Sequence, residues 1–446
     1  MELFKSCCTY IEEFFSNENQ DIKDNILKTD RFNKNIYIIN QIENDSNNID
    51  DNEKNARNYP KIIVIKKIRN DYNLFGFPNI GHSCYMNSFL QLLLHTPNFL
   101  EKLKESYQGT TEHPLIDSLL QLSSEDETKN KVKLLEIIKQ SMAEVEGSYG
   151  LKIQNDSQEF GINLIGQIIS IIKGEASFSD EEVLEEEENE LEYNKEYKKK
   201  SYKNYLNKYC EKEIPLEKMF QFHEIKYKVD IQEKTKISIK KIDFDSFLNI
   251  ELFFPKTKKK KTSYKLADLL EQKYPKTPEI EDSENESNII EKFINYLIDI
   301  YKQYKNKFFS HNPDNNNKNN QIINNNKLKY VYFSNLFSIP NFLIISINRA
   351  ILGKPIYKDI LKFEETLDLK DYLDKDILID GDTSYTLYGI NYCYKQLFTN
   401  SGHYYCSIKI NDEWYTFDDN KPVIKEEPDF NSKYVVGLYY IKNNQN

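Results

Sequence analysis

The sequence predicts an α+β fold, with helices in the first part of the chain and β structure in the last part. Apolar residues recur at helical spacing after residue 84, after residue 156 and over residues 288–304. Segments rich in β-branched and aromatic residues follow near the end of the chain, at 384–395, 402–410, 413–419 and 433–442. Runs of helices followed by runs of strands are typical of the α+β class.

Each predicted helix has one apolar face. In the first, which stops before Pro97, this face consists of Phe89, Leu90, Leu93 and Leu94. The second is capped by Asp156, and Glu159 stands at its third helical position. Its apolar face consists of Phe160, Leu164, Ile165, Ile168 and Ile172. The face of the third consists of Ile290, Phe293, Ile294, Leu297, Tyr301 and Tyr304.

A β-hairpin is predicted in the middle of the chain. Apolar residues alternate over 225–231 and again over 235–239, on either side of a short polar turn. We expect apolar packing to hold this region together. The candidate core residues are Ile225, Tyr227, Val229, Ile237, Ile239, Phe244 and Phe247.

Charged and low-complexity segments divide the chain of 446 residues. Residues 1–70 are predicted to be a largely disordered leader, because residues 17–60 are rich in Asn, Asp, Glu and Lys. Residues 71–443 are predicted to form one domain with insertions. The insertions are expected near 176–204, 256–265 and 310–328, in acidic, lysine-rich and asparagine-rich sequence respectively.

Composition excludes several classes of protein. The net charge of −11 argues against nucleic acid as a partner and is compatible with a basic ligand. No apolar run is long enough to cross a membrane, and the charged N-terminus does not resemble a secretory signal. The six cysteines show no disulfide framework, which favours the reducing cytoplasm or nucleus. We expect a monomer that binds neither nucleic acid nor membrane.

Cys84 stands between a glycine-containing turn and the start of the first apolar helix. At a helix N-terminus, the unpaired N–H groups and the helix dipole favour the thiolate over the thiol. The same N–H groups can stabilise an oxyanion formed when the thiolate attacks a carbonyl. Taken alone, Cys84 could equally be a small residue that fills a gap at a helix start.

A nucleophilic cysteine needs a base, and His403 is the strongest candidate. It follows a Ser-Gly pair at the mouth of a strand, and the next strand ends in Phe-Asp-Asp, which brings Asp418 to the same sheet edge. A carboxylate there can accept the imidazole N–H and fix its tautomer. Separately, His403 could be a loop residue and Asp418 a turn residue. Together with Cys84 they follow the chain order of papain-like thiol proteases.

The motifs around these residues resemble those of the ubiquitin-specific proteases. The stretch GFPNIGHSCYMNSFLQ is similar to the family's cysteine box, and QNDSQEF is similar to its Q-x-D-A-x-E-F element. IPNFLIISINRA resembles a family strand, and the sequence from LYGINYCYK to YVVGLYY resembles the histidine box and the closing strands. The resemblance runs from about residue 74 to residue 441.

The resemblance implies a papain-like cysteine protease fold made of thumb, palm and fingers. The thumb would be the helical part after Cys84, and the palm the late antiparallel sheet with His403. The fingers would be hairpins near 220–255 and around 330. The implied activity is thiol-dependent hydrolysis of the peptide or isopeptide bond after the C-terminal glycine of ubiquitin. The implied partners are therefore ubiquitin and ubiquitinated proteins, and no cofactor is implied.

The resemblance also implies roles for single residues. Cys84 would be the nucleophile, His403 the general base and acid, and Asp418 its orienter. Asn79 would donate its side-chain amide to the oxyanion hole, although it could also be only a turn residue. The residues implied to hold the ubiquitin tail are Gln154, Asp156, Glu159, Gly402 and Tyr404. That tail carries arginines, so an acidic cleft suits it.

The chain departs from the family pattern at three places. His82-Ser83 replaces the usual Asn-Thr before the cysteine, and the family strand ends here as INRA. The paired finger cysteines of the family are absent, and residues 205–340 contain only Cys210, His223 and His311 as soft ligands. We therefore predict no metal site, because structural zinc needs four closely placed ligands.

Two other functions remain open from the sequence. The chain could cleave another ubiquitin-like modifier with a diglycine tail. It could also bind ubiquitin without cleaving it, although such inert members typically lack the cysteine or the histidine, and both are present here.

Overall fold

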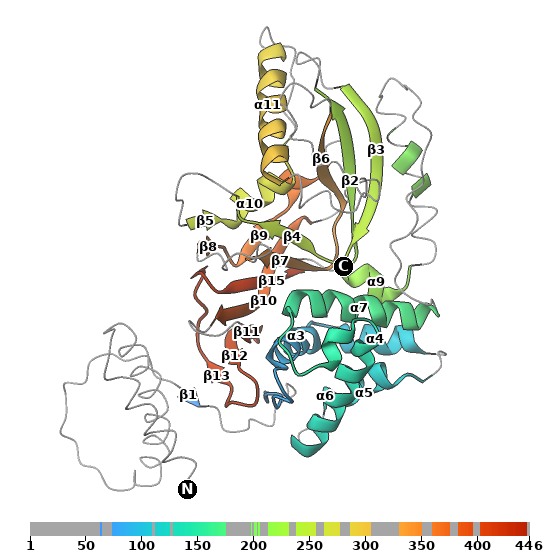
Figure 1. The fold of residues 1–446 in the computed structure, drawn as a ribbon, viewed down its shortest axis with the longest axis vertical. Helices are drawn as coiled ribbons and strands as arrows, with labels where there is room; N and C mark the ends of the chain where they lie inside the picture. Colours follow the sequence, from blue (N-terminus) through green and yellow to red (C-terminus); the bar gives the residue numbers. More distant parts are fainter. Residues whose placement is uncertain are drawn as a thin grey trace, which may run out of the picture. The chain divides into compact units, whose positions relative to one another are not determined.

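The computed structural model describes residues 63–64, 74–108, 112–124, 128–174, 198, 200–202, 204–205, 213–231, 238–255, 263–276, 286–304, 330–349, 359–374, 382–395 and 402–443. All of these residues belong to one compact unit that spans Ile62–Asn446. The α+β prediction is confirmed, because helices dominate the first part of the unit and strands the last (Figure 1). Within the described residues, no helix is both long enough and apolar enough to cross a membrane.

The helical part of the chain forms the thumb and gathers in one region of the structure (Figure 1). Its elements are α3 (Cys84–Leu94), α4 (Phe99–Tyr107), α5 (Pro114–Leu122), α6 (Thr128–Ala143), the 3-10 turn η1 (Gly147–Gly150), α7 (Ser157–Lys173) and α9 (Pro215–Phe220). The first two predicted helices are confirmed as α3 and α7. Asp156 caps α7 as predicted, accepting from the backbone N–H groups of Gln158 and Glu159 at 2.8 and 3.0 Å.

The palm is a nine-stranded sheet in the order β1-β13-β12-β11-β10-β15-β7-β4, with β9 also paired to β10. Its strands are β1 (Ile63–Val64), β4 (Ile250–Phe253), β7 (Phe342–Asn348), β9 (Thr366–Asp368), β10 (Ser384–Lys395), β11 (Gly402–Ile410), β12 (Glu413–Phe417), β13 (Ile424–Lys425) and β15 (Val435–Lys442). All pairs are antiparallel except β4 with β7. The late strands predicted from sequence are confirmed, and β10 and β11 coincide with their predicted bounds.

The fingers form a separate three-stranded sheet in the order β3-β2-β6. Strands β2 (Phe222–Asp230) and β3 (Ser238–Phe247) make the predicted hairpin, and β6 (Tyr330–Ser338) pairs with the other side of β2. Helix α11 (Glu286–Tyr304) packs on this sheet through its predicted apolar face. The second hairpin strand was predicted over residues 235–239, but β3 starts at Ser238 and continues to Phe247.

The predicted finger core is largely confirmed. Ile225, Tyr227 and Val229 are buried, and Ile239 and Phe244 pack against them while partly exposed. Phe247 packs instead against the palm core. Ile237 and the side chains of Tyr301 and Tyr304 lie outside the described residues.

The predicted insertions differ from the structure at their edges. The segment 256–265 was expected to be a loop, but Ser263–Lys265 forms β5, which pairs with β8 (Ile360–Lys362) beside β14 (Asn431–Ser432). Tyr264 of β5 is buried, and this apolar anchor is the reason that the loop ends early. Helix α10 (Leu266–Lys273) follows directly, and the 3-10 turn η5 (Lys370–Tyr372) lies further along the chain.

The structure also differs from the predicted bounds of the first insertion and of the leader. Lys198 lies inside the predicted insertion 176–204, yet it is buried and forms an ion pair with Asp374. Residues 63–64 lie inside the predicted leader, yet they form β1 and pair with β13 at the edge of the palm. The rest of the leader and the insertion near 310–328 lie outside the described residues.

The thumb packs on the palm through a close contact between α3, α7 and the central strands. Gly161 of α7 lies so near Phe89 of α3 that a Cβ atom there would stand 1.9 Å from the ring. Gly389 of β10 likewise leaves room for Leu92 of α3, with 2.5 Å to a built Cβ. Gly161 thus lets the two thumb helices approach each other, and Gly389 lets the thumb approach the palm.

We expect Gly161→Ala to lower the free energy of unfolding by about 1–3 kcal/mol, because a methyl group must displace the buried ring of Phe89. Denaturant unfolding of the two proteins measures the difference. Gly147→Ala is the matched control, because a Cβ at this exposed position meets no atom within 4 Å. Equal stability of Gly161→Ala and the wild-type protein would show that this packing is not tight.

Candidate active site

Cys84 is the first residue of α3 and is almost fully buried. The turn before it requires left-handed backbone at two successive residues, with φ of 100° at Gly81 and 52° at His82. Lys139 supports the turn by donating to the carbonyl oxygen of Gly81 at 3.4 Å. The thiol is therefore held at a helix N-terminus, as predicted, by a turn whose conformation favours particular residue types.

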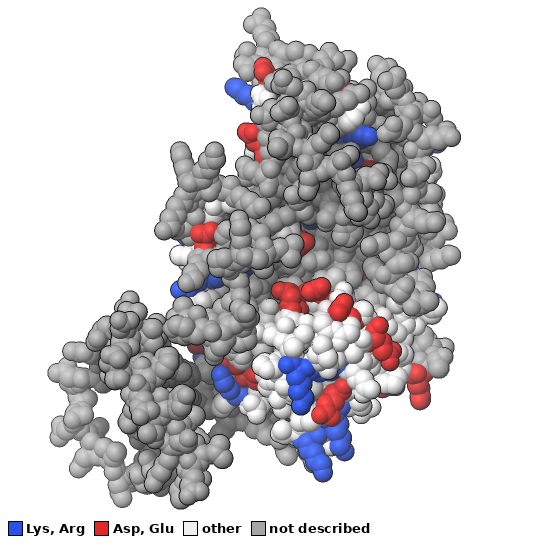
Figure 2. All heavy atoms as spheres, in the orientation of Figure 1, with Lys and Arg blue, Asp and Glu red and all other residues white. Residues whose placement is uncertain are grey.

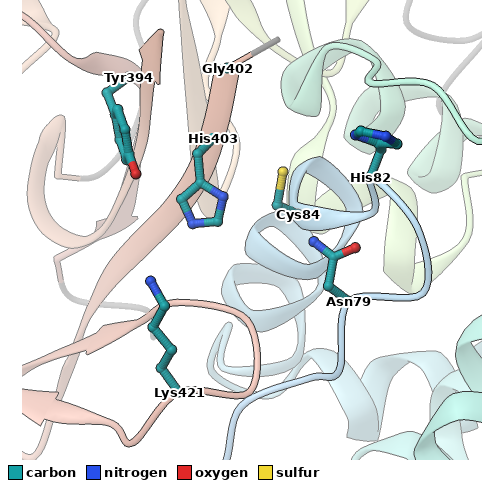
Figure 3. A pocket seen from close by; sticks show the side chains of 7 residues that line it. All are labelled: Asn79, His82, Cys84, Tyr394, Gly402, His403 and Lys421. Carbon is teal, nitrogen blue, oxygen red and sulfur yellow. The ribbon is translucent and has the colours of Figure 1, made fainter. Parts of the chain in front are cut away.

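The backbone conformation explains why His82 can stand where the family motif has Asn. Asn and His are enriched among non-glycine residues with positive φ, so His82 can occupy the position where the family usually has Asn. Its side chain is exposed and lines the same pocket as Cys84 (Figure 3). The substitution thus preserves the turn and adds a second imidazole to the pocket wall.

His403 is the second residue of β11 and faces Cys84 (Figure 3). Its Nε2 lies 2.6 Å from Oδ1 of Asp418, which leaves Nδ1 to face the thiol. Asp418 follows β12 and also accepts from Lys421 Nζ through Oδ2, at 2.7 Å. The ring of Tyr394, the residue paired with His403 across β10 and β11, packs edge-on against the imidazole at 5.6 Å between centroids.

The electrostatics of these groups favour a charged imidazole. Burial lowers the pKa of His403, but hydrogen bonds and charges of Asp418 and Cys84 outweigh it and raise the pKa to about 10. Burial raises the pKa of Asp418, but hydrogen bonds from His403 and Lys421 outweigh it, and the net shift is downward. His403 is therefore poised to hold a proton beside the thiol while Asp418 stays ionised.

Asn79 lines the pocket beside Cys84, and its amide is fixed on both sides. Its Oδ1 accepts from the backbone N–H groups of Gly81 and Ser83 at 3.1 and 3.2 Å, as in a turn. Its Nδ2 donates to Oδ2 of Asp419 at 2.9 Å. Turn formation and a catalytic amide are thus compatible roles.

Asp419 and Asn87 belong to the site but were not predicted from the sequence. Asp419 Oδ1 accepts from Asn87 Nδ2 at 2.8 Å, so one carboxylate connects the loop after β12 with helix α3 and with Asn79. The doublet Asp418-Asp419 was visible in the sequence, but only its first member was given a role. The left-handed backbone at Asp419, with φ of 49°, turns the second carboxylate toward the thumb.

Gln154 bridges the thumb and the palm at the pocket. Its amide oxygen accepts from the N–H of Gly402, and its amide nitrogen donates to the carbonyl oxygen of Gly402. The same nitrogen lies 3.7 Å from Sγ of Cys84. The pocket, of about 410 Å³, is lined by Asn79, His82, Cys84, Tyr394, Gly402, His403 and Lys421.

An acidic cluster surrounds the start of α7. Partial burial of the Glu159 carboxyl raises its pKa first, and the negative charges of Asp156, Glu146 and Glu251 raise it further. Acidic side chains gather beside and over α7 in Figure 2. Such crowded carboxylates favour a cationic partner. Tyr404 is buried, and its hydroxyl donates to Asp156 at 3.5 Å, so it joins β11 to this cluster.

Among the described residues, three side chains of the site are placed closely enough to be considered as metal ligands. His403, Asp418 and Asp419 present ligand atoms within 4.8 Å of one another. However, each of them already makes hydrogen bonds with protein partners, namely the Asp418–His403 pair and the bonds from Asn79 and Asn87 to Asp419. The geometry therefore fits a hydrogen-bonded catalytic network, and the absence of a metal requirement stays a prediction.

A buried thiol, an imidazole and a carboxylate in this order form the arrangement that is typical of papain-like thiol hydrolases. A family model described as ubiquitin carboxyl-terminal hydrolase matches residues 75–440. The chain belongs to the ubiquitin carboxyl-terminal hydrolase family, which confirms the resemblance seen in the sequence.

Curated relatives match a shorter part of the chain. Mouse ubiquitin carboxyl-terminal hydrolase 29 is 37% identical over 93 residues, which is 19% of this chain and 10% of that protein. Ubiquitin carboxyl-terminal hydrolase 23 of Arabidopsis thaliana is 34% identical over 86 residues, again 19% and 10%. The match thus spans only about a tenth of the length of these relatives.

Solved structures show the same fold at low identity. The chain matches the SAGA Ubp8/Sgf11/Sus1/Sgf73 DUB module bound to ubiquitin aldehyde with a TM-score of 0.52 and 17% identity. The match covers 84% of this chain and 70% of that chain. A structure titled as the Ubp8-Sgf11-Sgf73-Sus1 SAGA DUB module gives the same TM-score and identity, with 68% of that chain covered. The papain-like fold with thumb, palm and fingers is thereby confirmed.

We expect a strong chelator to leave the melting temperature of the protein unchanged, because an apolar core packs the described finger strands together and we predict no zinc site there. Thermal unfolding with and without chelator measures this, and elemental analysis of the purified protein is the control. Stoichiometric zinc together with a chelator-induced fall in melting temperature would contradict the prediction.

Proposed function

We propose that this chain is a cysteine-type deubiquitinase, which hydrolyses the peptide or isopeptide bond after the C-terminal glycine of ubiquitin. The observation that carries the proposal is the Cys84 thiol facing His403, itself bonded to Asp418, in a chain of the ubiquitin carboxyl-terminal hydrolase family. The partners proposed are ubiquitin and ubiquitinated proteins. The free state of Cys84, Cys393 and Cys406 supports a reducing compartment, the cytoplasm or the nucleus.

The proposed reaction has two steps. The Cys84 thiolate attacks the carbonyl carbon of the terminal glycine, and His403 Nδ1–H donates its proton to the departing amine, which leaves a thioester. Neutral His403 then takes a proton from water, whose oxygen attacks the thioester carbon and releases the carboxylate and the Cys84 sulfur. Asp418 holds the imidazole through Nε2 in both steps and stabilises its charged form.

Asn79 is proposed to stabilise the oxyanion of both steps. Its amide lines the pocket beside Cys84, and the backbone N–H groups at the start of α3 lie in the same turn. The bond to Asp419 fixes the amide before substrate arrives, so little reorganisation is needed in the transition state. This preorganisation is what a catalytic donor requires.

The tail of ubiquitin is proposed to enter between Gln154 and Gly402. The Gln154 amide satisfies both backbone groups of Gly402, as an extended peptide would. We infer that the incoming tail exchanges with these bonds and that Gln154 then pairs with the tail. The carboxylates of Asp156 and Glu159 suit the arginines that precede the diglycine.

We expect Cys84→Ala to abolish cleavage and to leave ubiquitin binding largely intact, because the thiol is small compared with the binding surface. The experiment incubates wild-type protein and variant with ubiquitin that carries a C-terminal thiol-reactive group. Mass spectrometry should find the adduct on Cys84 and on none of the other five cysteines.

The same reactive group on other diglycine-tailed modifiers separates the alternatives. Labelling by another modifier in preference to ubiquitin would replace the proposed substrate. Binding of ubiquitin without labelling or cleavage would show a non-catalytic family member. Full cleavage by Cys84→Ala would remove the proposed nucleophile.

We expect Asn79→Ala to lower kcat by about 100-fold to 1000-fold with KM little changed, because its amide meets the charge only in the transition state. Steady-state kinetics on a ubiquitin C-terminal fluorogenic substrate measures both constants. Since Asn79 also closes a turn, the melting temperature of the variant is compared with wild type. A folded variant with wild-type kcat would leave Asn79 as a turn residue alone.

A further inference from the structure

The Asp418 carboxylate is shared by two cationic side chains. Oδ1 binds His403 Nε2 at 2.6 Å, and Oδ2 binds Lys421 Nζ at 2.7 Å. Lys421 lies on the loop after β12, three residues beyond Asp418, and lines the pocket with His403 and Cys84. Figure 3 shows its ammonium group extending toward the space between Tyr394 and His403.

The other groups around Asp418 do not compete with Lys421 for this role. The carboxylate of Asp419 lies nearby but binds Asn79 and Asn87. The remaining titratable neighbours from β10, β11 and α3 are Tyr394, Tyr405, Cys406 and, beyond His403, Cys84. The pKa values of the two tyrosines and of the Cys406 thiol are raised, so these three groups stay neutral near pH 7. Among the described groups around Asp418, positive charge therefore comes from His403 and Lys421.

We propose that Lys421 is a positioning residue for catalysis: by occupying Oδ2 it keeps the Asp418 carboxylate ionised and turned so that Oδ1 stays on His403. Its ammonium acts on the reacting atoms through the carboxylate that it binds. The sequence resemblance assigns no role to this position.

The effect of removing Lys421 on the pKa of Asp418 has a definite direction. The bonds from His403 and Lys421 lower the pKa of Asp418, so the group stays ionised until the pH falls well into the acid range. Removal of Lys421 takes away one of these contributions, and the pKa of Asp418 rises. Once Asp418 is protonated it no longer holds the charged imidazole in place, so we expect the acid limb of the pH–rate profile to move to higher pH. Because the Lys421 side chain is 62% exposed, screening keeps the shift small, on the order of half a pH unit.

The test measures alkylation of Cys84 by iodoacetamide across pH, followed by mass spectrometry of the Cys84 peptide in the full chain. We expect the acid limb of Lys421→Met to lie about half a unit above that of wild type, which slows alkylation by about threefold below the midpoint. Lys421→Arg should retain the wild-type profile, because it keeps the cation. Raising the ionic strength should shrink the difference between Lys421→Met and wild type.

Two controls separate this role from a structural one. Lys425→Met removes a partly exposed lysine that pairs with Glu413 instead, and its profile should match wild type. In an Asp418→Asn background, Lys421→Met should cause no further shift, because the carboxylate is gone. Superimposable acid limbs of Lys421→Met and wild type, or an equal shift in the Asp418→Asn background, would overturn the proposal.

The pH dependence of cleavage rests on the proposed function, whereas alkylation of Cys84 does not. A shifted alkylation profile in a protein that fails to react with the ubiquitin probe would support the role of Lys421 and contradict the substrate. Labelling by the ubiquitin probe without a shift in the alkylation profile would support the proposed substrate and contradict the role of Lys421.

Discussion

The packing of α3 and α7 against the central strands of the palm is the constraint on which the active site depends. Cys84 and His403 lie on different layers and far apart in the chain, so only this interface brings them together. A buried network fixes its register: Ser157 Oγ donates to the carbonyl oxygen of Tyr85 at 2.7 Å and accepts from Asn391 Nδ2 at 2.8 Å. Buried polar groups that satisfy one another in this way favour a single arrangement of the layers.

Much of the fold could be predicted because local patterns determine it. The helical faces of α3, α7 and α11 and the bounds of β10 and β11 follow from periodicity and turn residues. The short strand β5 could not be found this way, because Tyr264 is anchored by a core assembled from distant segments. Lys198 in a lysine-rich run reads as a solvated charge, and only the position of Asp374 in space makes it a buried ion pair.

Part of the candidate site could likewise be predicted from the sequence, and part could not. Cys84, His403 and Asp418 could be proposed from sequence because residue type, chain order and predicted element ends agree. The partners of these groups depend on loop geometry that no pattern encodes. Asp419 turns toward Asn79 and Asn87 because of its backbone conformation, and Gln154 reaches Gly402 only because the thumb meets the palm there.

The position of His403 in its strand has a thermal consequence. His403 and Tyr394 form the second residue pair from the loop end of the β10–β11 hairpin, where Gly402 and Lys395 form the last pair. The described pairing of β11 with β12 starts only at Cys406, so His403 is paired on one side. Residue pairs at a strand end separate with a lower free energy of local unfolding than pairs in the core of a sheet. Warming should therefore detach the imidazole from its partners while the rest of the domain remains folded. The proposed catalysis would then be lost on heating before the whole domain unfolds.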